Sequence, residues 1–206
     1  MKAWFAAVAL LLGAPLAAQP QDITAPGTVA HRAAATGFPE TIGDFRRLAV
    51  TRYDSEGLDL SANYQLVRPD GQVRATIYIY PAAPSAAAPT APAARIRFCR
   101  EHFEGVENSI RQTYKGADRL DGDPTPVRGG VAPGLAHRSS FRFSADIGRG
   151  IERLVSEARL YCFVSGNWLV KYRISASEGM DARGAIESFV RLGPWPGQAP
   201  GEIALR

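Results

Sequence analysis

Two stretches of this 206-residue chain alternate apolar and polar side chains on both sides of a short turn, and they constrain its fold more than any other feature. In residues 60–80 the alternation surrounds an Arg-Pro-Asp-Gly turn at 68–71. In residues 158–174 it surrounds a Ser-Gly-Asn turn at 165–167. Because alternation with a period of two is typical of strands that bury one face, each stretch predicts an antiparallel β-hairpin.

A helix is predicted after each hairpin. The first has apolar side chains at three- and four-residue spacing, which places them on one helical face: Ile96, Cys99, Phe103, Val106, Ile110 and Tyr114. The second is expected over residues 181–192, and the Gly-Pro-Trp-Pro-Gly segment at 193–197 ends it. The order strands, helix, strands, helix favours the α+β class, with a largely antiparallel sheet and two main helices packed on it.

The first eighteen residues have the order of a secretory signal peptide. Lys2 supplies a positive charge, residues 4–12 are apolar, and small side chains at 15–18 precede the expected cut. The apolar run is shorter than the roughly 20 residues that a membrane span requires. We therefore expect a mature chain that begins at Gln19, is periplasmic or secreted, and has no transmembrane segment.

Composition divides the rest of the chain into three parts. Residues 19–40 are rich in Pro and Ala and predict a flexible lead-in. Residues 41–197 carry the predicted elements and are long enough for a single α+β domain. Residues 198–206 are expected to form a C-terminal tail. Inside the domain, residues 81–94 contain only Pro, Ala, Ser and Thr, which favours a solvated connector over a lid.

The charge pattern gives no sign of a nucleic-acid partner. The chain has 24 basic and 20 acidic residues and a formal net charge of +4, and the two signs are interleaved rather than gathered in blocks. Because the guanidinium group of arginine binds carboxylate and phosphate groups well, an anionic envelope polymer is a conceivable partner. The arginine-rich composition also fits the codon usage of a GC-rich bacterium.

The two cysteines, Cys99 and Cys162, are expected to form a disulfide. An even pair in an oxidising compartment is typically bridged, and loop-closure entropy gives such a bridge a contribution of about 4 kcal/mol. Both residues lie on predicted apolar faces. Two buried free thiols would give the same pattern, so the sequence leaves that alternative open.

Sequence motifs for catalysis or cofactor binding are absent from the chain, including GxxxxGK, GxGxxG, GxSxG and HExxH. Cys99 and His102 are three residues apart on the first helix, which would suit a thiolate and its base or half of a metal site, but core packing of Cys99 is favoured. Asp118, Asp121 and Asp123 do not follow the order of EF-hand ligands, which favours a polar turn over calcium binding. We therefore predict no catalytic, cofactor-binding or metal-binding residue.

Aromatic residues in and beside the strands are candidates to line a groove for sugar or peptide. The set comprises Tyr78, Tyr80, Trp168, Tyr172 and Trp195. Strand aromatics more often pack beneath helices. Trp195, which lies between two prolines after the last helix, is expected to close the core.

Three segments, 43–47, 74–80 and 167–174, resemble uncharacterised exported proteins of proteobacteria. The order of elements is also similar to the PsbP-like fold, in which helices flank a mainly antiparallel sheet. The exported family implies no activity, and PsbP-like proteins act as binding or assembly partners more often than as enzymes. The resemblance therefore implies a binding role without assigning it to any residue.

The function predicted from the sequence is a non-enzymatic binding or scaffolding protein of the bacterial cell envelope. Its partner would be an envelope protein, a peptide or a glycan. The alternative is an envelope-polymer hydrolase whose site is not visible as a motif.

Overall fold

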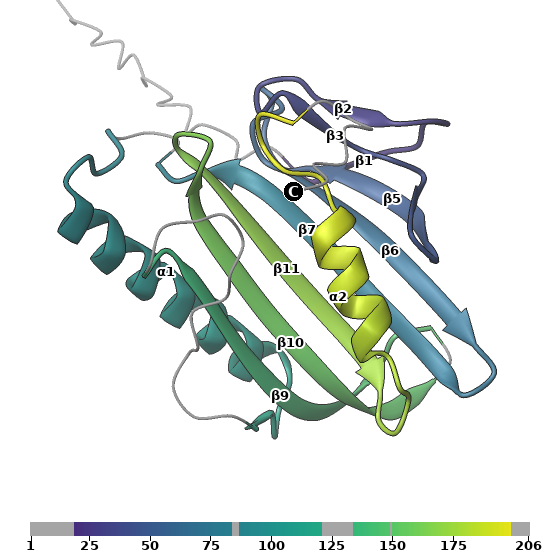
Figure 1. Ribbon diagram of the computed structural model, residues 1–206. Helices are drawn as coiled ribbons and strands as arrows, with labels where there is room; N and C mark the ends of the chain where they lie inside the picture. The colour runs from purple at the N-terminus through teal and green to yellow at the C-terminus, as the bar shows by residue number, and fades with distance from the viewer. Residues whose placement is uncertain (1–18, 84–86, 121–133, 149, 199–206) are drawn as a thin grey trace, which may run out of the picture.

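A nine-stranded antiparallel sheet runs through the computed structural model and carries one helix on each face (Figure 1). The structure describes residues 19–83, 87–120, 134–148 and 150–198. The strands are β1 (Gln21–Ile23), β2 (Val29–His31), β3 (Thr36–Phe38), β4 (Thr41–Ile42), β5 (Phe45–Arg52), β6 (Leu60–Arg68), β7 (Gly71–Pro81), β8 (Asp118–Arg119), β9 (Ala136–Asp146), β10 (Ile151–Val164) and β11 (Trp168–Ser177), and the helices are α1 (Pro92–Thr113) and α2 (Arg183–Leu192). The expected α+β class with a largely antiparallel sheet and two helices is confirmed.

The two predicted hairpins are confirmed and form the centre of the sheet. The strand order is β1-β5-β6-β7-β11-β10-β9-β8, with β4 also paired to β5. In the first hairpin Leu60 pairs with Ile79, and in the second Leu160 pairs with Lys171. The hairpins meet where β7 pairs with β11, with Tyr78 opposite Lys171. Successive side chains along each strand therefore point to opposite faces of one continuous sheet.

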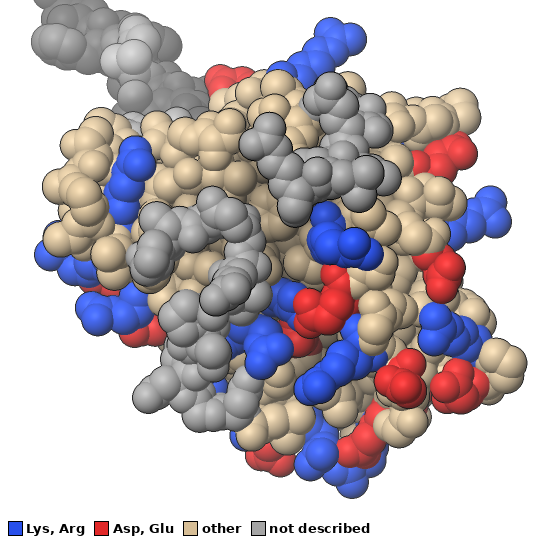
Figure 2. Space-filling view, viewed as in Figure 1, with Lys and Arg blue, Asp and Glu red and all other residues tan. Residues whose placement is uncertain are grey.

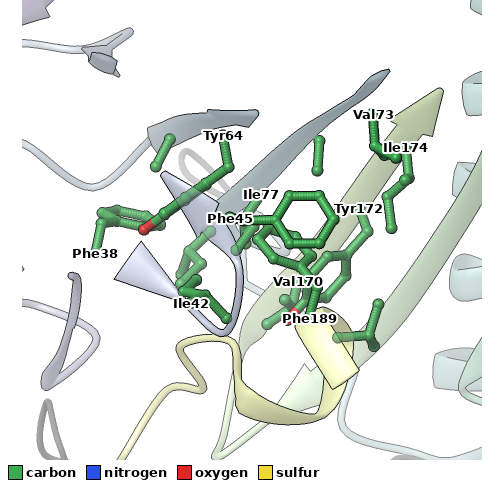
Figure 3. Close-up of a cluster of buried hydrophobic side chains, with 14 of the residues drawn as sticks. Phe38, Ile42, Phe45, Tyr64, Val73, Ile77, Val170, Tyr172, Ile174 and Phe189 are labelled. Carbon is green, nitrogen blue, oxygen red and sulfur yellow. The ribbon is translucent and has the colours of Figure 1, made fainter. Parts of the chain in front are cut away.

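Helix α2 covers one face of the sheet. Its Phe189 is fully buried and points into a cluster from β5, β6, β7 and β11 (Figure 3). The centroid of its ring lies 4.4 Å from that of Phe45 and 5.3 Å from that of Tyr64. Trp195, which follows α2, makes an edge contact with Tyr161 at 5.0 Å. On this face α2 and Trp195 thus shield the apolar side chains of both hairpins from solvent.

Helix α1 packs on the opposite face, against β9 and β10. Four of the six residues of its predicted apolar stripe, Cys99, Phe103, Val106 and Ile110, are buried, whereas Ile96 is 43 % exposed and Tyr114 follows the end of the helix. Cys99 is bridged to Cys162 of β10. Among the described residues, no helix has the length and apolar character needed to cross a membrane.

Residues 19–40, expected as a flexible lead-in, contain three short strands in the structure. β1 pairs with β5, and β2 and β3 pair with each other as a separate ribbon. Val29 and Phe38 from this segment belong to the cluster beneath α2. The structure differs from the expectation because strands of three residues have no measurable periodicity, and their packing partners lie far away in the sequence. The predicted signal peptide and residues 199–206 of the predicted tail lie outside the described residues.

His31 attaches the β2–β3 ribbon to the sheet. Its Nε2 lies 3.2 Å from the carbonyl oxygen of Ile79, and its Nδ1 accepts a hydrogen bond of 3.4 Å from the Ala34 N–H. The Trp168 ring meets it edge-on, 5.1 Å away. These contacts fit a neutral imidazole with its proton on Nε2. Burial lowers the pKa of His31 below its usual value of 6.5, against the opposing effect of the bond to Ile79.

Replacing both cysteines, as C99A/C162A, is expected to lower the free energy of unfolding by about 4 kcal/mol, because the bridge closes a loop between residues that are 63 positions apart. Urea denaturation followed by circular dichroism measures the change. Reduced wild-type protein is the control and should show a similar loss. Equal stability of the oxidised wild type and the double variant would contradict a stabilising role for the bridge.

Acidification below about pH 6.5 is expected to destabilise the protein, partly through His31. The folded pKa of His31 is lowered, so the unfolded chain binds more protons as the pH falls, and the stability held at neutral pH is lost. Urea denaturation between pH 7 and 5 measures the slope, and His31→Asn should make it shallower. An unchanged slope in the variant would show that His31 does not contribute to the acid sensitivity.

Candidate functional site

Helix α1 covers only part of its face of the sheet. It packs mainly on β9 and β10 and touches one end of β7 and β11 at Tyr80 and Leu169, so most of the face formed by β6, β7 and β11 lies beside this helix rather than beneath it. We call this part the open face. Its side chains are the polar members of the two alternating patterns: Ser61, Asn63, Gln65, Gln72, Arg74, Thr76, Tyr78, Tyr80, Lys171, Arg173 and Ser175. The hairpins that build the core therefore also fix this polar surface in place.

At one end of the open face the polar side chains satisfy one another. The bonds run from Thr76 Oγ1 to Asn63 Oδ1 (2.7 Å), from Gln65 Nε2 to Gln72 Oε1 (3.0 Å), from Gln72 Nε2 to Glu152 Oε1 (2.9 Å) and from Arg74 Nε to the Ile147 carbonyl (2.8 Å). These bonds satisfy polar groups that are buried or part-buried, such as those of Gln72. This end gives no sign of a ligand.

The middle of the open face holds two cations without a carboxylate partner. Lys171 and Arg173 are two residues apart on β11, so their Cα atoms are about 6.6 Å apart and their side chains share a face. Neither forms an ion pair with a described residue. The Nε atom of Arg173 is buried and has no hydrogen-bond partner within the described chain. A buried N–H group without a hydrogen-bond acceptor destabilises the fold, and this makes the position a candidate for ligand binding.

Aromatic rings surround the two cations. The Lys171 ammonium lies 3.9 Å from the centroid of the Tyr78 ring and 5.6 Å from that of Tyr80. The Arg173 guanidinium lies 5.9 Å from the centroid of the Tyr114 ring, just after α1. Rings of this kind attract a cation through their faces and also exclude water from it. The positive charges are therefore held in a partly dry setting.

The pKa values of the cations reflect this burial. Burial and, to a smaller extent, the charge of the neighbouring Arg173 lower the pKa of Lys171 to about 8, while Asp59 acts in the opposite direction. Burial also lowers the pKa of Arg173, although the nearby tyrosines oppose the change. Burial raises the pKa of Asp59. The charged state of the site is thus less favourable than it would be in water, and an added negative charge would stabilise it.

His102 forms the border between α1 and the open face. Its Nε2 lies 2.8 Å from the Tyr80 hydroxyl, and its ring stacks on Phe98 with centroids 5.8 Å apart. Burial and the charge of Lys171 both lower the pKa of His102, so the ring is neutral at pH 7. The hydrogen bond between Nε2 and the Tyr80 hydroxyl fixes the orientation of this tyrosine beside Lys171.

The candidates expected from the sequence are separated in the structure. Cys99 is in the disulfide, so it has no thiolate to pair with His102. Asp118 lies in β8, whereas Asp121 and Asp123 lie outside the described residues. In the part of the chain that is described, no cluster of three or more His, Cys, Asp or Glu side chains is arranged to hold a metal ion.

The five aromatic candidates are divided between the two faces of the sheet. Tyr78 and Tyr80 lie on the open face, whereas Tyr172, Trp168 and Trp195 pack in the cluster beneath α2. They do not line one groove. The expectation that strand aromatics pack beneath a helix is confirmed for Tyr172, and Trp195 contacts the core as expected.

The face that carries α2 has a different charge arrangement. Figure 2 shows basic and acidic side chains lying next to each other there. Glu178 pairs with both Arg142 (2.7 Å) and Arg153 (2.9 Å). Arg159 is only 2 % exposed and hydrogen-bonds to Glu187 and Glu157. Burial alone would lower the pKa of Arg159, but these two carboxylates outweigh it and raise the pKa. These cations are thus already neutralised by the protein.

A hollow of about 450 Å³ lies at another place, beside β1, β4 and β5. Arg47 lines it but is already engaged, because its guanidinium donates hydrogen bonds to the carbonyl oxygens of Phe38 and Ala25. Leu48 is 47 % exposed at this edge. The open face holds two part-buried cations, Lys171 and Arg173, whose pKa values are lowered by burial, which makes it the better candidate.

Comparison with known proteins adds no relative to this picture. No protein family model, no curated protein sequence and no solved structure matches the chain. The geometry and charge of the open face are therefore the basis for a functional proposal.

Replacing Lys171 by methionine is expected to leave the protein at least as stable at pH 7, because Met keeps the apolar contacts and removes a desolvated charge. The folded pKa of Lys171 lies below its usual 10.5, so the unfolded wild type holds more protons above pH 8 and the wild type gains stability as the pH rises. Lys171→Met should lack this gain. Urea denaturation from pH 7 to 9.5 measures it, with the exposed Lys115→Met as control. A variant that is clearly less stable at pH 7 would mean that Lys171 has a structural role.

Proposed function

We propose that this chain is a non-enzymatic binding protein of the bacterial cell envelope and that it binds an anionic ligand on the open face. The observation that carries the proposal is the pair of cations, Lys171 and Arg173, which are neighbours on one face of β11 and have no carboxylate partner among the described residues. The envelope location is supported by the sequence of residues 1–18. A disulfide between Cys99 and Cys162 is compatible with an oxidising compartment.

The unpaired cations have a simple physical interpretation. Burying a charge without a partner destabilises a fold, and elsewhere in this protein buried arginine is neutralised, as Arg159 is by Glu187. A carboxylate or phosphate group at the open face would supply the missing acceptor. It would take the N–H of Arg173 Nε and the ammonium of Lys171 as donors, and charge-assisted bonds of this type are among the stronger ones in proteins.

The chemistry of the face favours binding over hydrolysis. An envelope-polymer hydrolase would need a nucleophile with its base or a pair of carboxylates around the scissile bond. The groups described here are two cations, tyrosine hydroxyls and His102, which is neutral at pH 7. These groups hold and orient an anion. A relationship to PsbP-like proteins stays a prediction and would agree with the same role.

Isothermal titration calorimetry at low ionic strength, with inorganic phosphate and succinate as probes, tests the proposal. Wild-type protein is expected to bind an anion, and Arg173→Met should weaken the binding about tenfold or more, because a hydrogen bond to a charged group contributes about 1.5–3 kcal/mol. Lys115→Met is the matched control for the loss of one positive charge and should bind as the wild type does.

Two outcomes would contradict this proposal. One is the absence of anion binding, and the other is binding that Lys115→Met weakens as much as Arg173→Met, because it would reflect net charge alone. Native mass spectrometry of protein exported by its own signal adds an independent check. It is expected to show a chain beginning at Gln19, and any ligand retained by the wild type should be lost in Arg173→Met.

A further inference from the structure

The amine of Lys171 has an unusual setting for a lysine in this chain. Outside residues 1–18 the sequence has two lysines, Lys115 and Lys171. Lys115 is exposed, whereas Lys171 is part-buried with its ammonium 3.9 Å from the centroid of the Tyr78 ring. No described carboxylate is within ion-pair distance of Lys171. Its proton is therefore not held by a salt bridge.

Two features of this setting are known to activate an amine: removal from water and a second cation nearby. The groups that face Lys171 are Tyr78 and Tyr80 of β7, Arg173 of its own strand, His102 of α1 and Asp59 ahead of β6. Burial and Arg173 lower the pKa of Lys171 to about 8, and Asp59 only partly opposes them. At pH 7 about one amine in ten is then neutral, compared with about one in 2,500 for an ordinary lysine.

We propose that Lys171 is a nucleophilic amine that forms an imine with the carbonyl group of a small oxo acid whose carboxylate is held by Arg173. The proposal rests on the proposed function, because it adds a covalent step at the same two cations. Arg173 lies two residues along the strand on the same face, so the carboxylate on its guanidinium places the carbonyl carbon of a small oxo acid near the amine. The ligand class is thus an aldehyde or ketone that also carries a carboxylate.

The step balances without an oxidant or reductant. The lone pair of neutral Lys171 Nζ attacks the carbonyl carbon, a C–N bond forms, and the carbonyl π electrons move to oxygen, which takes a proton. The nitrogen then loses a proton, the hydroxyl group leaves with a proton as water, a C=N bond forms, and the nitrogen releases its second proton to give the neutral imine. The sum is amine plus carbonyl giving imine plus water. The reaction is reversible, so it retains a ligand without turning it over.

Reductive trapping tests this proposal. The protein is incubated at pH 7 with glyoxylate and cyanoborohydride, and peptide mass spectrometry measures the carboxymethyl group added to each lysine. Because Lys115 and Lys171 lie in different peptides, Lys115 is an internal control. Lys171 is expected to react about tenfold faster than Lys115. Lys171→Arg keeps a positive charge and should leave only the slow reaction at Lys115 and at the terminal amine.

A second variant separates the amine from the carboxylate. Arg173→Met should slow trapping of glyoxylate at Lys171 much more than trapping of propionaldehyde, which has no carboxylate. Equal slowing of both would overturn the role of Arg173, and equal labelling of the two lysines would overturn the activation of Lys171.

Titration of the same variants with succinate, which has no carbonyl group, separates this inference from the proposed function. If succinate binds through Arg173 but glyoxylate is not trapped at Lys171, the covalent step is wrong and anion binding stands. If succinate does not bind at all, both proposals fail.

Discussion

The disulfide between Cys99 and Cys162 fixes where α1 lies, and the rest of the functional surface depends on that position. It joins the first half of α1 to β10, with the two Cα atoms 5.9 Å apart, so the helix axis stays over β9 and β10. The apolar stripe of α1 then covers the apolar side chains of those strands. What remains of this face, above β6, β7 and β11, is left with polar side chains. The open face is thus a consequence of a helix that is anchored at one side of a wide sheet.

The side chains on the two faces of the central hairpins are packed in different ways. On one face Phe189 and its neighbours from α2 fill the space above the apolar residues. On the other, the polar side chains are buried or part-buried and several pair with one another, as Thr76 does with Asn63. Lys171 and Arg173 depart from this pattern. In a protein whose Arg159 is paired with Glu187, two neighbouring cations that no described carboxylate pairs with are better explained by a ligand than by stability.

The sequence was sufficient for the elements with a strong local pattern. The alternation over residues 60–80 and 158–174 predicted both hairpins, and the spacing of Cys99 and Phe103 predicted the inner face of α1. The lead-in was not predicted as part of the core. Its strands are three residues long, and the contact that attaches His31 is to a carbonyl in β7, 48 residues away. No local period carries that information.

Tyr78 and Tyr80 of the candidate site were among the sequence candidates, but its two cations were missed for a different reason. The alternation around Lys171 does place it on the polar side of its strand, but a polar side chain on a half-buried strand usually points to water. Its significance depends on two tertiary facts: α1 lies to one side of Lys171 rather than on top of it, and the residue opposite in β7 is Tyr78 rather than an acid. The local sequence signal for the two cations is small. It consists of a lysine and an arginine two positions apart and of a paired β7 segment that contains no acidic residue.

The chemical identity of the two cations, one arginine and one lysine, also has a consequence. A bound carboxylate beside Lys171 would raise the pKa of its amine and so reduce the neutral fraction that can act as a nucleophile. Arg173 opposes this effect. Its guanidinium stays charged at any physiological pH, so its positive charge offsets the influence of the carboxylate on the pKa of the amine. A second lysine in place of Arg173 would share its proton equilibrium with Lys171 and lose part of this protection. The pairing of one fixed and one titratable cation is therefore what allows a single surface to bind an acid and still present a reactive amine.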